Sequence, residues 1–475
     1  MLKKYLIKTF SFFLVFLILL SMVSCRSKDT QNTVVSYDGV VLNYYKLYDD
    51  PDFIEARISD FVKNYPGLKI NYKVFNNYDE YSNLILNEMA DGEGPDIFSM
   101  PNTWFASNSK KVRPMPQKYA LPAEFSNTFV DVAYSDLVLN DSSGIPQIYG
   151  LPLYIDTLAL YYNNSYFEDV LASQGKPSNT WEGIKSDVLA LTKFDENTNE
   201  ISVAGIAIGT SYNISRAVDI LYLLFLQEGV SFYNENISLA TFNSKTNAQK
   251  SLNALELFLS FNDPNQRYYT WDGYLADSTK NENEVDAFAK GNVAMIIGYS
   301  YTYSQILNKI KVLKSSGQLV IDPKVVKITY IPQMTDVSSK NSIRVTYANY
   351  FAETVSRNCK YSDIAWEFLA FMANKDNQIK YFSELKKPTS RRDLIDSQKN
   401  DPVYGVFVQQ IGFAKSFPVI DSTKYNIIFK DLIFKSKNSL ALQSLLNQAE
   451  KSVSLLLSPV GLLVPLNEKA LNQTK

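Results

Sequence analysis

Residues 61–100, FVKNYPGLKINYKVFNNYDEYSNLILNEMADGEGPDIFSM, contain the succession of elements that decides the fold. The dipeptide Pro66-Gly67 ends a helical stretch, and the run that follows predicts a strand over residues 68–75. A helix is predicted over residues 81–90, and a glycine-rich turn then leads into a strand over residues 96–100. Helices and strands that alternate in this way are typical of α/β proteins.

The same pattern extends outward in both directions. Residues 40–44 predict a first strand, and residues 53–65 predict a helix because Ile54, Ile58, Phe61 and Val62 recur at helical spacing. Downstream, Asn102 and Trp104 follow the strand at residues 96–100. Open α/β sheets bind ligands beyond the C-terminal ends of their strands, so these two residues are candidate ligand contacts.

The N-terminus predicts secretion and lipid attachment. Three lysines precede an apolar run at residues 10–20 that is shorter than a membrane span, as in a signal peptide over residues 1–24. A small residue, Ser24, stands directly before Cys25, which resembles a lipobox and predicts acylation of that cysteine. Residues 25–36 are then a polar, lipidated tether. Met22 departs from the commoner lipobox leucine, which leaves an ordinary signal peptide or an uncleaved anchor as the alternatives.

Composition sets further bounds. The chain of 475 residues is too long for one ordinary core and suits two or three domains. Without the three leader lysines it has 44 basic and 49 acidic residues, which argues against a nucleic-acid partner. Cys25 and Cys359 are the only cysteines, so no disulfide framework is expected, and Cys359 is read as a packed side chain.

The sequence contains no histidine, which removes the usual base of serine and cysteine hydrolases and the commonest ligand of zinc. Glycine-rich phosphate loops and dinucleotide fingerprints are also missing from the sequence, so we expect no catalytic residues, no cofactor and no metal site. Aromatic residues are abundant instead, with 32 Tyr, 28 Phe and 4 Trp. Tyrosine combines a flat apolar face with a hydroxyl, which suits a site that stacks on sugar rings.

Seven segments, in order, resemble the family 1 extracellular solute-binding proteins, the maltose-binding-protein-like substrate-binding lipoproteins of ABC importers. The segments are FVKNYPGLKINY (61–72), GEGPDIF (92–98), GLPLYIDTLALYYNNSYF (150–167), NTWEGIKSDVLALT (179–192), VAGIAIG (203–209), DAFAKGNVAMIIG (286–298) and SDIAWEFLAFMANKDNQIKYF (362–382). The match spans most of the mature chain, and the order of the seven segments makes the resemblance specific.

The resemblance implies a two-lobed, type II periplasmic-binding-protein-like fold, in which each lobe is a mixed sheet flanked by helices and the ligand cleft lies between the lobes. Crossings are expected near residues 153–157 and 347–352. Lobe 1 would comprise residues 37–153 and 351–395, and lobe 2 would comprise residues 154–350 and 396–475.

The resemblance also implies ligand contacts. The run YGLPLYIDTLALYYN (149–163) predicts one continuous apolar strand, and Asp156 is the one acid inside it. A buried acid needs a partner, which the ligand would supply. Tyr301 and Tyr303 match an aromatic pair that stacks on sugar in the family, although simple core packing is the alternative for every aromatic residue named. The full set of expected contacts is Asp156, Tyr301, Tyr303, Asn102, Trp104, Asn213, Arg216 and Tyr425.

The predicted function is therefore capture of a small polar ligand, a sugar or oligosaccharide, by a monomeric extracytoplasmic lipoprotein. This lipoprotein would deliver the ligand to the membrane subunits of an ABC importer. Two other classes stay open. A glycoside hydrolase with paired carboxylates needs no histidine. A receptor with the same two lobes would present its ligand to a signalling partner instead of a permease.

Overall fold

The computed structural model describes residues 36–336, 338–339, 343–437 and 439–457. The predicted signal peptide, Cys25 and nearly all of the tether lie outside the described residues. Among the described helices, none is both long enough and apolar enough to cross a bilayer.

The first sheet contains six strands in the order β2-β1-β3-β14-β4, with β7 also paired to β14. Strands β1, β2 and β3 are parallel, whereas β14 is antiparallel to β3, β4 and β7. Their bounds are β1 (Val41–Leu47), β2 (Lys69–Phe75), β3 (Ile97–Pro101), β4 (Val112–Arg113), β7 (Leu151–Pro152) and β14 (Phe351–Ser356).

The predicted elements of this sheet are confirmed to within a few residues. The helix expected at residues 53–65 is α2 (Pro51–Val62), which begins where the Asp50 side chain accepts a hydrogen bond from Phe53 N at 2.9 Å. The helix expected at residues 81–90 is α3 (Tyr78–Ala90), with Asn77 as its N-cap. Further helices on this sheet are α4 (Phe105–Asn108), α5 (Pro122–Thr128), α6 (Asp131–Leu137), α13 (Ser362–Met372) and α14 (Lys375–Leu385).

The second sheet contains five strands in the order β12-β8-β11-β10-β9, of which β10 and β11 are parallel and the other pairs antiparallel. Every residue of β8 and β11 is buried, because helices cover both faces of the sheet. Its strands are β8 (Ala159–Asn163), β9 (Lys193–Phe194), β10 (Ile201–Ile206), β11 (Val293–Gly298) and β12 (Val326–Thr329). Its helices are α7 (Asn164–Val170), α8 (Trp181–Leu191), α9 (Ala217–Gln227), α10 (Ala248–Ser260), α11 (Glu284–Lys290) and α12 (Thr302–Ser315).

Two smaller pairings and four C-terminal helices complete the chain. The hairpin β5–β6 belongs to the first half, and the short pair β13–β15 lies where the chain passes between the halves. Their bounds are β5 (Val138–Asn140), β6 (Pro146–Ile148), β13 (Thr346–Tyr347) and β15 (Ala414–Lys415), and the helices are α15 (Ile395–Gln398), α16 (Gly405–Gln410), α17 (Ser422–Ser436) and α18 (Leu442–Leu457).

The apolar run at residues 149–163 is not the single strand that the sequence predicts. It splits into β7 and β8, which belong to different sheets, and the residues between them form no regular strand. A strand that leaves one sheet for another cannot keep its ladder of hydrogen bonds through the passage.

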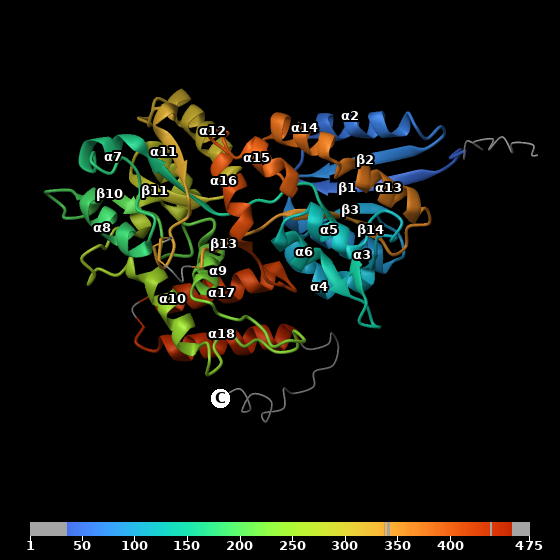
Figure 1. Cartoon of the computed structure of the whole chain (residues 1–475). Coiled ribbons are helices and arrows are strands. Elements are labelled where there is room, and N and C mark those ends of the chain that lie inside the picture. Colours follow the sequence, from blue (N-terminus) through green and yellow to red (C-terminus); the bar gives the residue numbers. More distant parts are fainter. Residues whose placement is uncertain (1–35, 337, 340–342, 438, 458–475) are drawn as a thin grey trace, which may run out of the picture.

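Buried side chains form two separate cores, one for each half of the molecule. One core gathers residues 40–155 and 348–381 with Ile411 and Ala414. The other gathers residues 158–347 and most of the buried side chains in 407–453. Figure 1 shows the halves side by side, with the first sheet on the right and α15 and α16 between them. The exact lobe boundaries stay a prediction; because residues 155 and 348–350 pack in the first core, we propose that its lobe extends to them.

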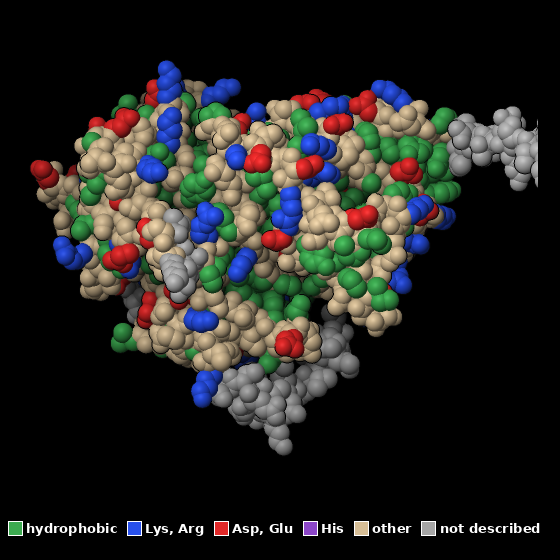
Figure 2. Space-filling view, in the orientation of Figure 1, with side chains coloured by type: hydrophobic (Ala, Val, Ile, Leu, Met, Phe, Trp, Pro, Cys, Tyr) green, Lys and Arg blue, Asp and Glu red, His purple; other side chains and the backbone are tan. Residues whose placement is uncertain are grey.

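Acidic and basic side chains are intermixed over the face seen in Figure 2, without a continuous basic stripe on that face. Cys359 is buried in the first core and is not part of a disulfide.

Candidate functional site

Three short segments of the chain lie side by side between the two halves. We call them the first (153–157), second (347–350) and third (414–415) passages, and the region that they form the junction. The strand β1 ends toward the other half, as its arrow in Figure 1 shows. Two passages lie side by side there, because Thr157 forms an isolated antiparallel bridge with Ala348. Ala348 N in turn donates to Lys415 O at 2.9 Å, which brings the third passage alongside.

Asp156 lies in the first passage and is 2% exposed. Its carboxylate accepts hydrogen bonds from Ser300 N at 2.9 Å, Ser300 Oγ at 2.7 Å and Thr157 N at 2.9 Å. Burial raises its pKa, and the bonds from Ser300 oppose that rise. The sequence predicts that the ligand is the partner of this buried acid, but Ser300 and Thr157 of the protein satisfy its carboxylate in this structure. Through Ser300, Asp156 also fixes the turn that carries Tyr301.

Tyr301 presents an aromatic surface next to this turn. Its ring stacks on Tyr299 with a centroid distance of 5.7 Å and an interplanar angle of 27°. The Arg216 guanidinium lies 5.5 Å from the Tyr301 ring centre and 5.6 Å from that of Tyr299. The Tyr301 hydroxyl is buried and makes no hydrogen bond of good geometry within the described part of the chain. Burial raises the pKa of Tyr301, and the nearby Arg216 guanidinium opposes that rise.

Asp219, on α9, contacts two members of the same cluster, Tyr299 and Arg216. It accepts a hydrogen bond from Tyr299 Oη at 2.9 Å and lies 3.8 Å from Arg216 Nη1. This ion pair is long, and 42% of the Arg216 side chain is exposed. Tyr303 points elsewhere, with its ring edge-on to Tyr404 at 6.1 Å.

Asn102 and Trp104 are both at the junction, and both bond to protein groups. Asn102 Nδ2 donates to Asp136 at 2.9 Å, and its Oδ1 accepts from Tyr350 N at 3.1 Å. Trp104 Nε1 donates to Ser422 Oγ at 2.8 Å at the start of α17, which joins the first half to the second. Their role as ligand contacts stays a prediction.

A partly buried carboxylate, Asp136, bonds to side chains from both halves. It accepts from Asn102 Nδ2, from Tyr350 Oη at 2.8 Å and from Ser416 Oγ. Burial raises its pKa to about 6, although the three donors favour the charged form.

Asn213 and Tyr425 lie inside the second core, each 1% exposed. Asn213 Oδ1 accepts from Trp271 Nε1 at 3.2 Å, and its Nδ2 donates to Ala276 O at 3.2 Å. The Tyr425 hydroxyl lies 3.1 Å from that of Tyr233. The structure therefore gives both side chains packing and hydrogen-bonding roles, and it does not bring them to the Tyr301 cluster.

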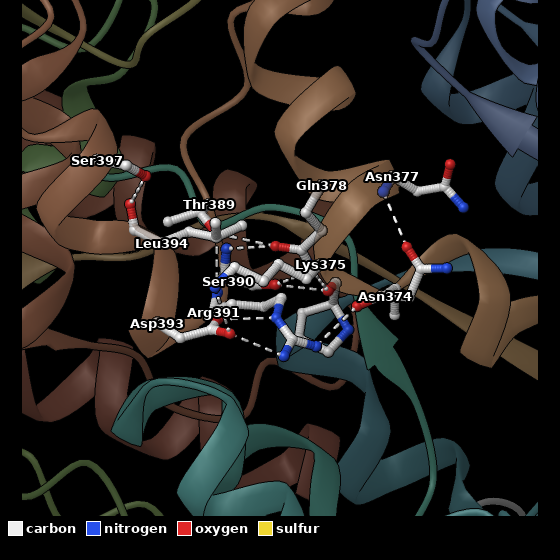
Figure 3. Close-up of polar contacts among 12 residues, drawn as sticks. Asn374, Lys375, Asn377, Gln378, Thr389, Ser390, Arg391, Asp393, Leu394 and Ser397 are labelled. Atoms are coloured by element: carbon white, nitrogen blue, oxygen red, sulfur yellow. Dashed lines mark hydrogen bonds and ion pairs between the residues drawn. The ribbon is translucent and has the colours of Figure 1, made fainter.

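A buried amide, Gln378, organises the loop between α14 and α15 (Figure 3). Its Nε2 donates to Ser390 Oγ at 2.7 Å and to Pro152 O at 3.2 Å, while its Oε1 accepts from Thr389 Oγ1 at 2.9 Å. Ser390 Oγ also donates to Pro152 O at 2.7 Å. This network fastens the loop after α14 to the end of β7, directly before the first passage.

Sequence reasoning missed Asp219, Asp136 and Gln378. Asp219 carried a usable signal, because it is one acid within the apolar helix AVDILYLLFLQ, just as Asp156 is one acid within an apolar run. No group of three or more His, Cys, Asp or Glu side chains in the described residues has an arrangement that would hold a metal ion.

Comparison with known proteins adds a family match. The sequence pattern described as bacterial extracellular solute-binding protein matches residues 56–403. Among curated proteins, the chain is similar to proteins of Brucella abortus (strain 2308) and Brucella suis biovar 1 that are named as binding proteins. Each is 22% identical over 378 residues, covering 79% of this chain and 82% of the relative.

Solved structures share the fold. The sugar-binding protein MalE from Xanthomonas citri has a TM-score of 0.68 at 13% identity, covering 92% of this chain and all of that one. A cyclo/maltodextrin-binding protein complexed with maltotetraose has a TM-score of 0.65 at 18% identity, covering 88% and 98%. A Thermotoga lettingae ABC transporter solute-binding protein bound with α-D-tagatose has a TM-score of 0.64 at 16% identity, covering 88% and 100%. These likenesses confirm the predicted α/β fold with two mixed sheets flanked by helices.

Proposed function

The chain belongs to the bacterial extracellular solute-binding protein family, and we propose that it captures a sugar or oligosaccharide for an ABC importer. Members of this family bind solutes and are not enzymes, so the glycoside hydrolase alternative no longer applies. The family is one of extracellular proteins. Attachment to the membrane through a lipid on Cys25, delivery to importer membrane subunits and a monomeric state are parts of the proposal.

The observation that carries the proposal is the Tyr301 cluster. A sugar ring has apolar C–H faces and hydroxyls at its edge, so it needs a flat aromatic surface beside hydrogen-bonding groups. Tyr301 supplies the ring and a buried hydroxyl that makes no hydrogen bond of good geometry within the described residues, and Arg216 supplies a cationic side chain next to it. A buried unpaired hydroxyl costs folding energy, and a bound ligand that pairs with it removes that cost.

The structural neighbours support a carbohydrate ligand. Those with maltotetraose and α-D-tagatose bound, and the Xanthomonas citri sugar-binding protein, cover 88 to 92% of this chain with the same fold. Since their identity to this chain is at most 18%, the ligand itself has to be found by experiment.

The direct test is a thermal-shift screen of the purified protein against a carbohydrate library that includes maltotetraose, mannotriose and α-D-tagatose. A ligand at a hundred times its Kd stabilises the folded state by about 2.7 kcal/mol, which is readily detected. Calorimetric titration then gives the affinity for each positive compound. A library in which no carbohydrate shifts the melting temperature, while a ligand of another class does, contradicts the sugar proposal.

Tyr301→Phe tests the site separately from the ligand class. The variant keeps the ring and removes a hydroxyl that makes no hydrogen bond of good geometry within the described residues, so its unliganded melting temperature should change little. Affinity should fall roughly threefold to tenfold, because one hydrogen bond of about 1 kcal/mol to the ligand is lost. Tyr299→Phe is the matched control, since it removes a hydroxyl bonded to Asp219 and should lower stability. If Tyr301→Phe binds the ligand with unchanged affinity, the ligand does not contact this hydroxyl.

A further inference from the structure

Tyr48, directly after β1, has a backbone conformation that tyrosine rarely adopts. Its φ is +52°, in the left-handed region. Among the described non-glycine residues the same region is also occupied by Asn199, Asn281, Ile237 and Lys386. Asparagine tolerates this region, whereas a tyrosine there is strained, as are the isoleucine and the lysine. Such strain persists only where the surroundings enforce it, and it concentrates at functional sites.

The contacts on both sides of Tyr48 hold this conformation. Its backbone N donates to Phe75 O at 2.9 Å, at the end of β2. The next residue, Asp49, pairs with buried Lys46 at 3.1 Å and accepts a hydrogen bond from Tyr381 Oη. Asp50 then caps α2. The backbone is thus fixed by its neighbours, while the tyrosine side chain itself is not the group that fixes it.

The ring of Tyr48 is directed to a surface at the junction. It meets the Phe351 ring edge-on, with centroids 6.5 Å apart and an interplanar angle of 71°. Phe351 is the first residue of β14, directly after the second passage. Half of the Tyr48 surface (50%) is exposed, so a large aromatic face stays open at the C-terminal edge of the parallel strands. This edge is where α/β sheets bind ligands.

We infer that Tyr48 is a ring-stacking residue for the carbohydrate, on the first half of the molecule, an inference that rests on the proposed function. The strained backbone presents a rigid aromatic ring, half of whose surface has no protein cover. Burial of that face by the C–H side of a sugar ring is favourable, and Phe351 limits the rotation of the ring. The ligand would then contact aromatic side chains from both halves, Tyr48 from one and Tyr301 from the other.

The test uses Tyr48→Asn and Tyr48→Phe, with Tyr361→Asn as the matched control. Asparagine tolerates the left-handed region, so Tyr48→Asn removes the ring and relieves the strain. Its unliganded melting temperature should stay within about 2 °C of wild type or rise above it. Affinity, measured by calorimetry with maltotetraose, mannotriose and α-D-tagatose, should fall about tenfold or more for the sugar that binds wild type.

The controls separate stacking from packing. Tyr48→Phe keeps the ring and should bind within about threefold of wild type. Tyr361 is another exposed tyrosine (44%), but it lines a polar cavity with Asp96 and Gly92 at the opposite end of the sheet, so its replacement should leave affinity unchanged.

Three results would overturn the inference, and the failure of the proposed function is distinguishable from the failure of the stacking role. If wild type binds one of the sugars and Tyr48→Asn binds it equally well, Tyr48 has no stacking role although the proposed function stands. A melting temperature several degrees lower with unchanged affinity of the folded protein leads to the same conclusion, because the ring is then packing. If wild type binds none of the three sugars while another class of ligand stabilises it, both the proposed function and the inference fail.

Discussion

Replacement of Asp136 by asparagine should change how the stability of the protein depends on pH. In the folded protein the pKa of this carboxyl is raised to about 6 by burial, compared with 3.8 ordinarily. Asparagine has nearly the same shape, and its oxygen would accept from Asn102 and Tyr350 while its amide donates to the Ser416 hydroxyl. The substitution thus keeps the three hydrogen-bond partners, with the Ser416 hydroxyl accepting instead of donating, and removes the charge.

The direction of the pKa shift of Asp136 determines whether stability rises or falls with pH. A folded-state pKa above the unfolded value means that the folded protein prefers the protonated acid. The corresponding stability is complete below about pH 3.8 and is lost as the pH rises through about 6. The shift corresponds to at most about 3 kcal/mol, and partial solvent access reduces this to about 1 to 3 kcal/mol. Asp136→Asn should therefore match wild type near pH 4 and exceed its unfolding free energy by that amount at pH 8.

Urea unfolding of wild type, Asp136→Asn and the exposed control Asp169→Asn, at pH values between 4.5 and 8, measures this difference. Glu450, whose pKa is raised to about 7 by burial, titrates in the same direction, but all three proteins contain it and its contribution cancels in the comparison. A stability difference between Asp136→Asn and wild type that stays constant over this pH range would refute the reasoning. The same would hold if Asp169→Asn reproduced the effect.

Two further predictions concern the anchor and the contact between the halves. Cys25→Ser should release the protein from membranes and abolish incorporation of labelled fatty acid; retention of both would mean that the lipobox interpretation fails. Trp104→Phe and Ser422→Ala each remove the same 2.8 Å hydrogen bond, so each should lower the unfolding free energy by about 1 kcal/mol. Their double mutant should lose less than the sum of the two, and strict additivity in urea unfolding would show that the bond contributes nothing.

Local periodicity made much of the fold predictable. The helices near residues 51–62 and 78–90, and the strands beside them, were identified because apolar spacing, caps and turns agree with one another there. The split of residues 149–163 between two sheets was not visible, since an apolar run looks the same whether it stays in one sheet or changes sheets. Only the family resemblance placed a crossing there.

The site was less accessible to sequence reasoning. Asp156 was identified because an acid in an apolar run is unusual, but the protein donors that satisfy it, from Ser300, lie 144 positions away. Asp136 meets Ser416 across 280 positions, and no local pattern encodes such a pairing. Tyr48 was missed for another reason, because its backbone conformation leaves no mark on residue type.

The position of β14 constrains how the chain is made. This strand lies between β3 and β4 in the first sheet, and its residue Glu353 contacts Ser99, which is 254 positions earlier. At synthesis rates of about 5 to 20 residues per second, roughly 10 to 50 s pass between the synthesis of Ser99 and that of Glu353. During that time the nascent N-terminal half has an open sheet edge and no complete core, so it cannot fold ahead of the rest of the chain. A protein whose early half stays unfolded throughout synthesis remains suited to passage across a membrane before folding, and it folds as a whole only once the later strands have arrived.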